Sequence, residues 1–367
     1  MKILHTISGM GTKCGGTTSC TYELAKGLYK QNINISILTY APDANDHIIG
    51  DDVFIRTVPR PGHFVSNPYK RLLKAFDYQL VHANGLWEYT ELITARIARK
   101  TRKPYVISPH GMLYPQALAI SKFKKQLFLK LFLMKDLNKA AAIHATCMEE
   151  MQHLRNLGVK SPIAVIPNPI VYEYKPIISQ ANTRKQIGFI GRFHPIKNID
   201  NLIDAFKKVN HPRHSLILIG SGPPDYENFL KEKAAGSNIL FPGFLDKKAK
   251  ENIFNSLSYV VLPSHSENFG MAVTEALLHG IPVIASKGTP WEDLNTHKCG
   301  WWIDNDVDTL AETIQKAIET PERSRIAMGK RGQVLVRKNY SVEVVAKKMI
   351  RLYEWILNGG EKPEFVY

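Results

Sequence analysis

Short apolar runs alternate with amphipathic segments along most of the chain. Six apolar runs lie in the first half, at residues 2–8, 33–39, 78–84, 104–111, 141–147 and 163–168. Five more lie in the second half, at residues 186–192, 215–222, 238–244, 259–264 and 282–286. Segments with helical periodicity lie between most of these runs, and strands that alternate with helices are typical of βαβ units. The pattern therefore predicts an α/β fold with parallel sheets.

The two series of strands predict two Rossmann-like domains. Residues 168–185, which lie between the two series, are rich in Pro, Tyr and polar side chains. We expect an N-terminal domain over residues 1–170 and a C-terminal domain over residues 171–344, with a last helix at about 345–367 that packs back on the first domain. Ligands of open parallel sheets bind beyond the carboxyl ends of the strands, so we expect a site in a cleft where the two domains face each other.

Charge and composition narrow the class of protein. The 367 residues carry a net charge of +15, and residues 1–180 contain 23 Lys and Arg against 12 Asp and Glu, a net charge of +11. A basic half predicts an anionic partner: a membrane surface, a phosphorylated substrate or nucleic acid. No nucleic-acid recognition module is visible, so nucleic acid is not expected. The chain shows no signal peptide, no apolar run long enough for a transmembrane helix and no CxxC pair, which predicts a cytoplasmic protein with free thiols.

The segment SHSENFGMAVTEALLHGIPVIAS, residues 264–286, places two carboxylates around the start of a predicted helix. The helix is expected to begin near Gly270, between Glu267 and Glu275. Backbone N–H groups at a helix start bind anions such as a diphosphate, and carboxylates accept hydrogen bonds from hydroxyls. The segment therefore fits a nucleotide sugar, with Glu267 on the sugar and Glu275 on the ribose. Helix capping beside an unrelated surface acid is the alternative.

Cations and a histidine stand at other predicted strand ends. Arg192 and Lys197 follow the first strand of the second half, where two cations can neutralise a diphosphate. His110 ends the run at 104–111. Asn84 and Trp87 follow the run at 78–84 and are candidate acceptor-side residues. For each of them a purely structural role is the alternative.

Two further motifs are weaker. The stretch SGMGTKCGGTTS at residues 8–19 lacks the third glycine of a dinucleotide fingerprint, and no acid follows the second strand, so a nicotinamide cofactor is not expected. The stretch DNDVD at residues 304–308 contains Asp-x-Asp, but it precedes a helical pattern and helix capping by Asp explains it. No metal site and no cofactor are therefore expected.

A basic, apolar segment lies at residues 121–139. At about 100° per residue, one face is expected to pack on the domain and carries Phe123, Leu127, Leu131 and Met134. The opposite side carries aromatic rings among lysines, with Lys124, Lys125, Phe128, Phe132, Lys135 and Lys139. This combination is typical of a membrane interface, and burial of the rings under a neighbouring loop is the alternative.

The motif at residues 264–286 resembles the E-x7-E segment of retaining family-4 glycosyltransferases, which have the two-domain GT-B fold, and the resemblance extends over nearly the whole chain. It implies sugar contacts for Glu267, ribose contacts for Glu275 and backbone contacts to the donor for Asn268, Phe269, Gly270 and Met271. It also implies phosphate contacts for Gly16, Arg192 and Lys197, a donor-sugar contact for His110, and positions beside the base for Gly220 and Phe244.

The resemblance implies a retaining, metal-independent enzyme that moves a sugar from a nucleotide-diphospho-sugar, by family frequency a UDP-sugar. The expected acceptor is a lipid or a lipid-linked saccharide in surface-polysaccharide, lipopolysaccharide or glycolipid assembly. The protein is expected to be cytoplasmic and to bind peripherally to the anionic inner face of the cell membrane. Two alternatives remain: a GT-B nucleotide-sugar epimerase, and a nonenzymatic protein that binds polyanions or membranes.

Overall fold

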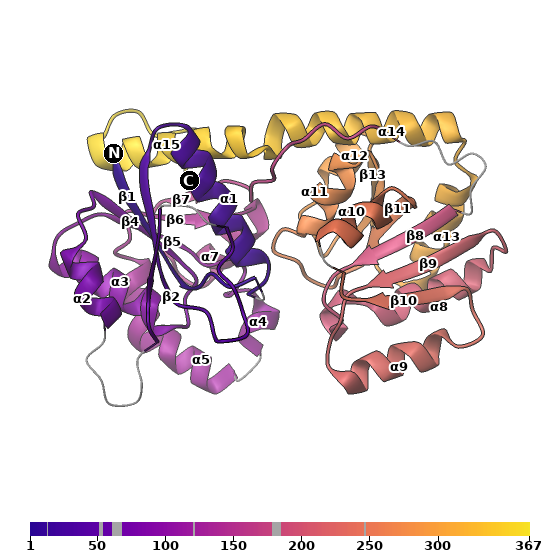
Figure 1. Ribbon diagram of the computed structural model, residues 1–367, viewed down its shortest axis with the longest axis horizontal. Helices are drawn as coiled ribbons and strands as arrows, with labels where there is room; N and C mark the ends of the chain where they lie inside the picture. The colour runs from indigo at the N-terminus through magenta and orange to yellow at the C-terminus, as the bar shows by residue number, and fades with distance from the viewer. Residues whose placement is uncertain (13, 51–53, 61–67, 120–121, 178–184, 246) are drawn as a thin grey trace. The chain divides into compact units, whose positions relative to one another are not determined.

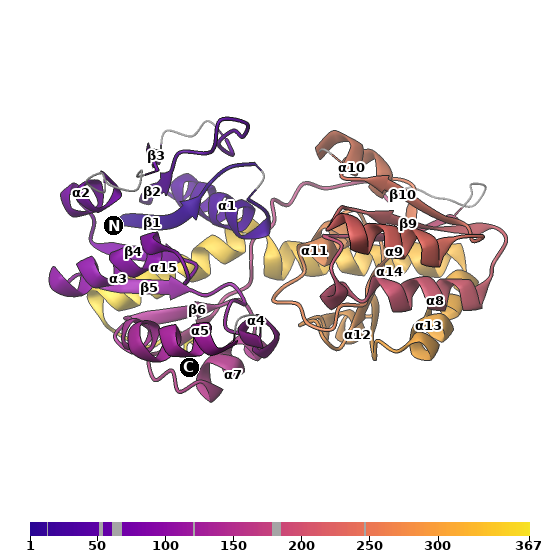
Figure 2. The same ribbon diagram turned by 90° about the horizontal axis from the view of Figure 1, so that it is seen from below.

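The computed structural model describes residues 1–12, 14–50, 54–60, 68–119, 122–177, 185–245 and 247–367. They form two compact units, the first from Met1–Val171 with Ser341–Tyr367 and the second from Tyr172–Tyr340. Each unit contains a parallel sheet with helices on both of its faces (Figures 1 and 2). The predicted α/β class with two Rossmann-like domains is therefore confirmed.

Unit 1 is built on a seven-stranded sheet in the order β3-β2-β1-β4-β5-β6-β7, and its neighbouring strands run parallel. The strands are β1 (Lys2–Gly9), β2 (Asn34–Tyr40), β3 (Ile55–Val58), β4 (Leu80–Asn84), β5 (Tyr105–Ser108), β6 (Ala142–Ala145) and β7 (Ile163–Val165). Because parallel strands need crossover connections, a helix follows most strands and covers one face of the sheet.

Two apolar cores lie on the two faces of this sheet. One is closed by α2 (Pro68–Ala75), α3 (Tyr89–Lys100), the π-helix η1 (Leu129–Leu133), α6 (Met134–Leu137) and α7 (Met148–Asn156). The other is closed by α1 (Gly16–Lys30) and the C-terminal helix α15 (Val342–Asn358). Gly27 allows α1 and α15 to pack closely, since a Cβ at Gly27 would lie 2.6 Å from Cγ2 of Val342.

Unit 2 repeats the scheme with a six-stranded parallel sheet in the order β10-β9-β8-β11-β12-β13. The strands are β8 (Lys185–Ile190), β9 (His214–Ile219), β10 (Ile239–Gly243), β11 (Leu257–Leu262), β12 (Val283–Ser286) and β13 (Gly300–Ile303). The helices are α8 (Ile199–Val209), α9 (Pro224–Ala234), α10 (Lys247–Phe254), α11 (Met271–Leu278), α12 (Asp293–Thr296), α13 (Val307–Glu319) and α14 (Glu322–Leu335). In Figure 1, α8 and α9 lie on one face of the sheet, and α11 and α14 lie on the other.

The two edge strands β3 and β13 do not appear in the sequence prediction. Each has four residues, and most of those residues are exposed or half-buried. β3 (Ile-Arg-Thr-Val) lacks a continuous apolar run, whereas β13 (Gly-Trp-Trp-Ile) is an apolar run of only four residues that was missed in the sequence analysis.

The predicted packing face of the segment 121–139 is wrong. The structure forms α5 (Lys122–Phe128), η1 and α6 here, and Leu129, Leu133 and Leu137 face the core. Of the residues expected to be covered, Phe123, Leu127 and Leu131 are 79%, 48% and 60% exposed, and Met134 is half-buried. Leucines occur on both sides of this helical run, so periodicity alone did not decide which side packs. A π-turn also shifts the phase of the residues that follow it.

Candidate donor and catalytic site

In both units several predicted site residues lie near the point where the strand order reverses. That point falls between β1 and β4 in unit 1 and between β8 and β11 in unit 2. Gly16 follows β1 and Asn84 ends β4, whereas Arg192 follows β8 and Glu267 follows β11. Open α/β sheets bind ligands at such switch points, beyond the carboxyl ends of the strands. In each unit, predicted residues thus lie at the kind of sheet edge where open α/β sheets bind ligands.

In unit 2 the structure brings together two motifs that lie far apart in the sequence. Lys197 ends the short 3₁₀ helix η2 (Pro195–Lys197), and its ammonium forms an ion pair with Glu267. The two side chains are only 16% and 17% exposed. The backbone joins the same loops, because His265 donates its N–H to the carbonyl of Ile196 at 2.8 Å. Arg192, at the end of β8, is exposed.

Gly270 begins α11 in a conformation that favours glycine, with φ of 80°. A Cβ here would lie 2.9 Å from Cδ2 of Leu262 and 3.2 Å from Cγ of Glu267. Gly270 is the N-cap and has no side chain to cap the helix, and the first turn contains no acid. The positive end of the α11 dipole therefore lies close to Glu267. No carboxylate in the first turn of α11 neutralises this partial charge.

The loop after β12 packs against the loop that carries Glu267. This contact was not predicted from the sequence. Trp291 is fully buried, and its indole N–H donates to the carbonyl of Phe269 at 2.5 Å. The N–H of Glu267 donates to the carbonyl of Gly288 at 2.8 Å. A Cβ at Gly288 would lie 2.4 Å from the carbonyl oxygen of His265, so no larger residue fits there. The only signal in the sequence was the Gly-Thr-Pro-Trp stretch at residues 288–291.

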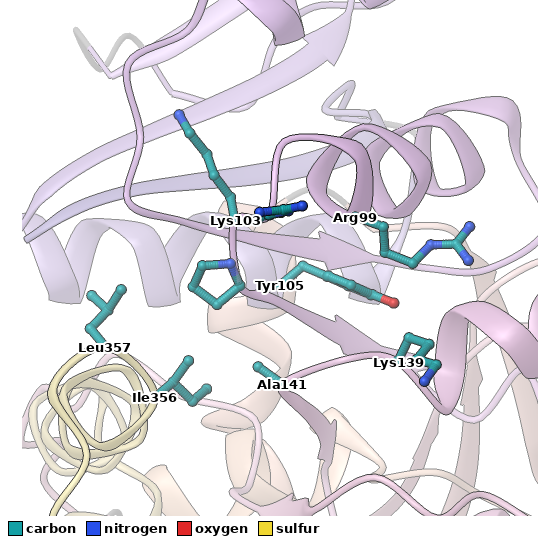
Figure 3. A pocket seen from close by; sticks show the side chains of 9 residues that line it. Arg99, Lys103, Tyr105, Lys139, Ala141, Ile356 and Leu357 are labelled. Carbon is teal, nitrogen blue, oxygen red and sulfur yellow. The ribbon is translucent and has the colours of Figure 1, made fainter.

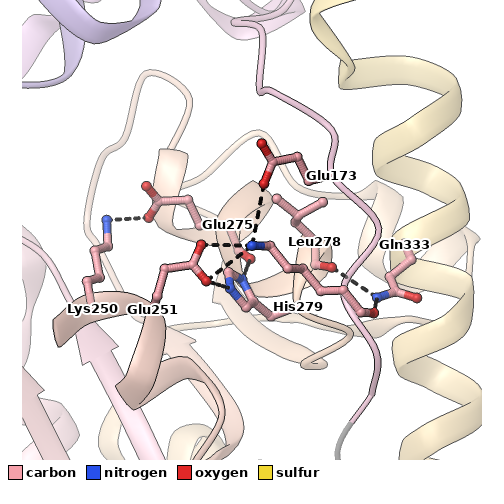
Figure 4. A network of polar contacts seen from close by, with 8 residues as sticks. Glu173, Lys250, Glu251, Glu275, Leu278, His279 and Gln333 are labelled. Atoms are coloured by element: carbon pink, nitrogen blue, oxygen red, sulfur yellow. Dashed lines mark hydrogen bonds and ion pairs between the residues drawn. The ribbon is translucent and has the colours of Figure 1, made fainter. Parts of the chain in front are cut away.

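Glu275 lies one turn before the end of α11 and pairs with Lys250 of α10 at 2.6 Å. Beside this pair, Figure 4 shows a second network centred on Glu251, which binds Lys175 at 3.0 Å and His279 at 3.1 Å. The hydrogen bond from His279 and the Lys175 ammonium hold the pKa of Glu251 below its usual value. His279 also hydrogen-bonds the carbonyl of Glu275 at 2.8 Å, so the network fixes the helix turn that carries Glu275.

The two residues expected beside the base differ in how tightly the fold holds them. Gly220 has φ of 146°, and a Cβ there would lie 1.9 Å from the carbonyl oxygen of Gly191. This backbone crowding excludes any side chain. Phe244 follows β10 and is 80% exposed, so its ring contacts few described residues.

In unit 1, His110 lies in a turn just after β5 and has an uncommon left-handed backbone, with φ of 51°. Its Nε2 donates to Oδ1 of Asn84 at 3.2 Å. The pKa of His110 falls to about 3, mainly because desolvation disfavours the imidazolium, with smaller repulsive contributions from His144 and His5. His110 is therefore neutral at physiological pH.

A chain of buried polar groups lies behind His110 and joins the sheet to α15. Tyr353 of α15 hydrogen-bonds His5 at 2.9 Å and His82 at 2.7 Å. Ser108 then bridges His82 at 2.6 Å and His144 at 2.7 Å. Burial lowers the pKa of His5 to about 3 and that of His144 to about 4. His5 and His144 are therefore neutral at physiological pH.

Trp87 and Asn84 do not form a common surface. Asn84 is buried, whereas Trp87 is half-buried and packs on Phe128 with ring centroids 6.1 Å apart. Lys125 lies over the Trp87 ring at 5.5 Å, and its ammonium donates to the carbonyl of Ala117 at 2.6 Å. Phe128 and Lys125 therefore make contacts within unit 1. Of the residues predicted to contact a membrane, Lys124, Phe132 and Lys135 are exposed.

Gly16 and the Asp-x-Asp stretch occupy helix starts. Gly16 is the first residue of α1, and a Cβ there would meet no atom of the described residues within 4 Å. Asp306 caps α13 by accepting a hydrogen bond from the Thr309 N–H at 2.9 Å.

A cavity of about 490 Å³ lies away from these sites (Figure 3). It opens at the amino ends of β5 and β6, the opposite edge of the sheet from His110, and its lining includes Arg99, Arg102, Lys103 and Lys139. The C-terminal ends of α3 and α15 border it. Because helix C-termini carry partial negative charge, these cations have a structural explanation there.

Comparison with known proteins agrees with this arrangement. Residues 172–335 match the family described as "Glycosyl transferases group 1", and residues 15–169 match the "Glycosyl transferase 4-like domain". The chain belongs to the group 1 glycosyltransferases of the GT-B fold.

Its relatives and structural neighbours are distant in sequence. The chain is 24% identical to an uncharacterised glycosyltransferase of Methanocaldococcus jannaschii, over 95% of this chain and 94% of that protein. It is 21% identical to the O-antigen chain mannosyltransferase C of Escherichia coli, over 94% of this chain and 95% of the relative. The crystal structure of Anabaena HepE in complex with UDP and glucose superposes with a TM-score of 0.75 at 20% identity, over 96% of this chain and 99% of that one.

Proposed function

We propose that the protein is a retaining glycosyltransferase that uses a nucleotide-diphospho-sugar, with UDP as the favoured nucleotide. The proposed acceptor is a lipid or a lipid-linked saccharide in surface-polysaccharide, lipopolysaccharide or glycolipid assembly. The observation that carries the donor class is the pairing of Lys197 with Glu267 beside the start of α11. The UDP of Anabaena HepE and the O-antigen role in the name of the Escherichia coli relative support the donor and the acceptor class.

Each proposed role follows from charge and position. Lys197, Arg192 and the start of α11 would bind the diphosphate and stabilise the charge that develops as it leaves. Glu267 would accept hydrogen bonds from the sugar, and Glu275 would accept them from the ribose. His110, which is neutral, would bind a donor-sugar hydroxyl. Since cations and a helix start supply the positive charge, the proposed reaction needs no metal.

The proposed transfer keeps the anomeric configuration. The acceptor hydroxyl would attack C1 from the face that the diphosphate leaves, the C1–oxygen bond to the diphosphate would break, and the departing phosphate oxygen would take the acceptor proton. Glu267 would stabilise the positive charge on the sugar during this step.

We further propose that unit 1 binds an anionic membrane through the outer side of α5 and η1. Four large apolar side chains are exposed there, Phe123, Leu127, Leu131 and Phe132, and Lys124, Lys130 and Lys135 are exposed among them. Apolar groups flanked by lysines insert at a bilayer interface and attract anionic headgroups. In the part of the chain that the structure describes, no helix is long and apolar enough to span a bilayer.

A thermal-shift panel in EDTA tests the donor proposal. The protein is heated with saturating UDP, GDP, ADP, NAD, UDP-glucose, UDP-N-acetylglucosamine and GDP-mannose. A ligand that binds only the folded protein must raise the Tm. A selective rise with one nucleotide and its sugars is expected. No shift with any of these nucleotides would overturn the assignment of Lys197, Glu267 and Glu275.

A further inference from the structure

The turn that carries His110 is unusual because two consecutive residues adopt left-handed backbone conformations. His110 has φ of 51° and Gly111 has φ of 76°. Glycine adopts this region readily, whereas a histidine does so only where the surroundings hold it. Something in the fold must therefore stabilise this turn.

Glu150 of α7 is the side chain that holds it. Its Oε1 accepts a hydrogen bond from the Gly111 N–H at 2.6 Å. Its Oε2 accepts from the Thr146 N–H at 2.7 Å and from the Thr146 hydroxyl at 3.0 Å. Glu150 is 1% exposed, and none of the ion pairs found among the described residues involves it. A buried carboxylate is costly unless it is hydrogen-bonded, and here three neutral donors supply those bonds.

These contacts join the loop after β5 to the loop after β6. Thr146 directly follows β6, and Gly111 lies three residues after the end of β5. Glu150 spans the two loops with a single side chain, so the peptide between His110 and Gly111 has one orientation. The functional group that this orientation presents is the His110 ring.

Asn84 fixes the ring itself. The Asn84 amide Nδ2 donates to the carbonyls of Thr6 at 3.4 Å and of His82 at 3.3 Å, which leaves Oδ1 facing His110. Since Oδ1 only accepts, the proton of His110 must lie on Nε2, and Nδ1 keeps its lone pair. Nδ1 makes no hydrogen bond to the described residues, so it can accept one from a ligand hydroxyl.

We propose that Glu150 is a positioning residue for His110: it holds the His110–Gly111 turn so that Nδ1 can accept a hydrogen bond from a hydroxyl of the donor sugar. This inference rests on the proposed function. It changes the role expected for Asn84 from an acceptor contact to a second positioning residue. It also predicts that turnover and nucleotide binding can change separately, because Glu150 and His110 lie in unit 1 whereas Lys197, Glu267 and Glu275 lie in unit 2.

The test uses Glu150→Gln in the full chain, with Glu149→Gln as the matched control. Glu149 is the neighbouring residue on the same helix turn, but its side chain is 40% exposed and it faces His153 rather than Gly111. The measured quantities are UDP affinity and the rate of donor hydrolysis, with UDP-glucose or GDP-mannose as the probe according to the thermal-shift panel. For Glu150→Gln we expect kcat to fall on the order of 10- to 100-fold with KM and UDP affinity within about twofold, because small misplacements of a reacting group have effects of this size. Glu149→Gln should match the wild type.

A double-mutant cycle separates positioning from general folding support. If Glu150 acts through His110, adding Glu150→Gln to His110→Ala should lower kcat no further. A further fall equal to the effect in the wild type would overturn the proposal, as would a Glu150→Gln variant with unchanged kcat. If Glu150→Gln does not fold, Thr146→Val removes one of the three hydrogen bonds, and the same cycle with His110→Ala applies. Should the wild-type protein neither bind a nucleotide nor hydrolyse a donor, the proposed function fails instead.

Discussion

Lys197 and Glu267 form an ion pair although 70 residues separate them in the sequence. The pair joins the loop after β8 to the loop after β11, the two strands that flank the switch point of unit 2. Both groups are also proposed ligands of the donor, Lys197 for the diphosphate and Glu267 for the sugar. In this structure the ammonium is bound to the carboxylate, so a diphosphate must compete with Glu267 for Lys197.

This competition predicts opposite effects of Glu267→Gln on binding and on turnover. Removing the carboxylate charge frees Lys197, so UDP should bind equally well or more tightly, by up to about 1 kcal/mol. Turnover should fall on the order of 10²-fold, as for the loss of one group that stabilises a transition state. Titration calorimetry with UDP and the donor hydrolysis rate measure the two effects. Glu292→Gln, at an exposed residue of the same unit, is the control. Weaker UDP binding with unchanged turnover would contradict the prediction.

Glu275→Gln should weaken UDP binding if Glu275 holds the ribose. The loss of a hydrogen bond to a charged acceptor predicts about 1–3 kcal/mol. Lys250→Met leaves the carboxylate but removes its ion pair, so this variant should bind UDP at least as well as the wild type. Isothermal titration of both variants with UDP provides the comparison. If both variants lose the same affinity, the ion pair itself and not the ribose contact is responsible.

Substitutions on the outer side of α5 and η1 should reduce membrane binding. Phe123→Ser with Leu131→Ser removes two exposed apolar groups, each worth about 1.5–3 kcal/mol when fully buried. Lys124→Glu with Lys130→Glu should weaken binding by about 1 kcal/mol per lysine removed. Because salt screens charges, high salt should diminish the effect of the lysine substitutions but not that of the apolar ones. Sedimentation with vesicles that contain anionic lipid measures both.

The control for this surface is Phe229→Ser on α9, which is 47% exposed and belongs to unit 2. It should sediment with vesicles as the wild type does. Equal sedimentation of all variants would rule out this surface as the membrane contact.

The histidines whose pKa is lowered in the fold predict that acid destabilises unit 1. His5, His110 and His144 have folded pKa values of about 3, 3 and 4, whereas an unfolded histidine has a pKa of about 6.5. Below pH 6.5 the unfolded chain binds protons that the folded chain does not, so the free energy of unfolding falls as the pH falls. Each histidine contributes up to about 1.4 kcal/mol per pH unit between pH 6.5 and its folded pKa. Glu91, whose pKa burial raises to about 7, opposes this trend.

The contribution of one histidine can be isolated by substitution. We expect His144→Gln to flatten the dependence of unfolding free energy on pH between 6.5 and 4.5, by up to about 1.4 kcal/mol per unit. His47→Gln, at an exposed residue of unit 1, should leave the slope unchanged. Urea unfolding at several pH values gives the slopes. Parallel slopes for wild type and His144→Gln would show that His144 is not held neutral by the fold.

The sequence alone determined the fold class and most of the strand ends at which chemistry is expected. Buried parallel strands need continuous apolar runs, and their carboxyl ends must carry the polar residues that meet a ligand. His110, Arg192 and Glu267 were predicted as site residues for this reason. Two short strands were not predicted: β3, which lacks such a run, and β13, whose apolar run has only four residues.

Only the tertiary structure decided which distant residues meet and which side of a helix is covered. Lys250 beside Glu275, Glu150 beside Gly111 and Trp291 beside Phe269 each join separate segments of the chain. No periodicity along the chain records such contacts. The helical run at residues 122–137 has leucines on both sides, and the sheet of unit 1 selected Leu129, Leu133 and Leu137 for the core. Periodicity identifies an amphipathic element, but the surface that it packs against determines its orientation.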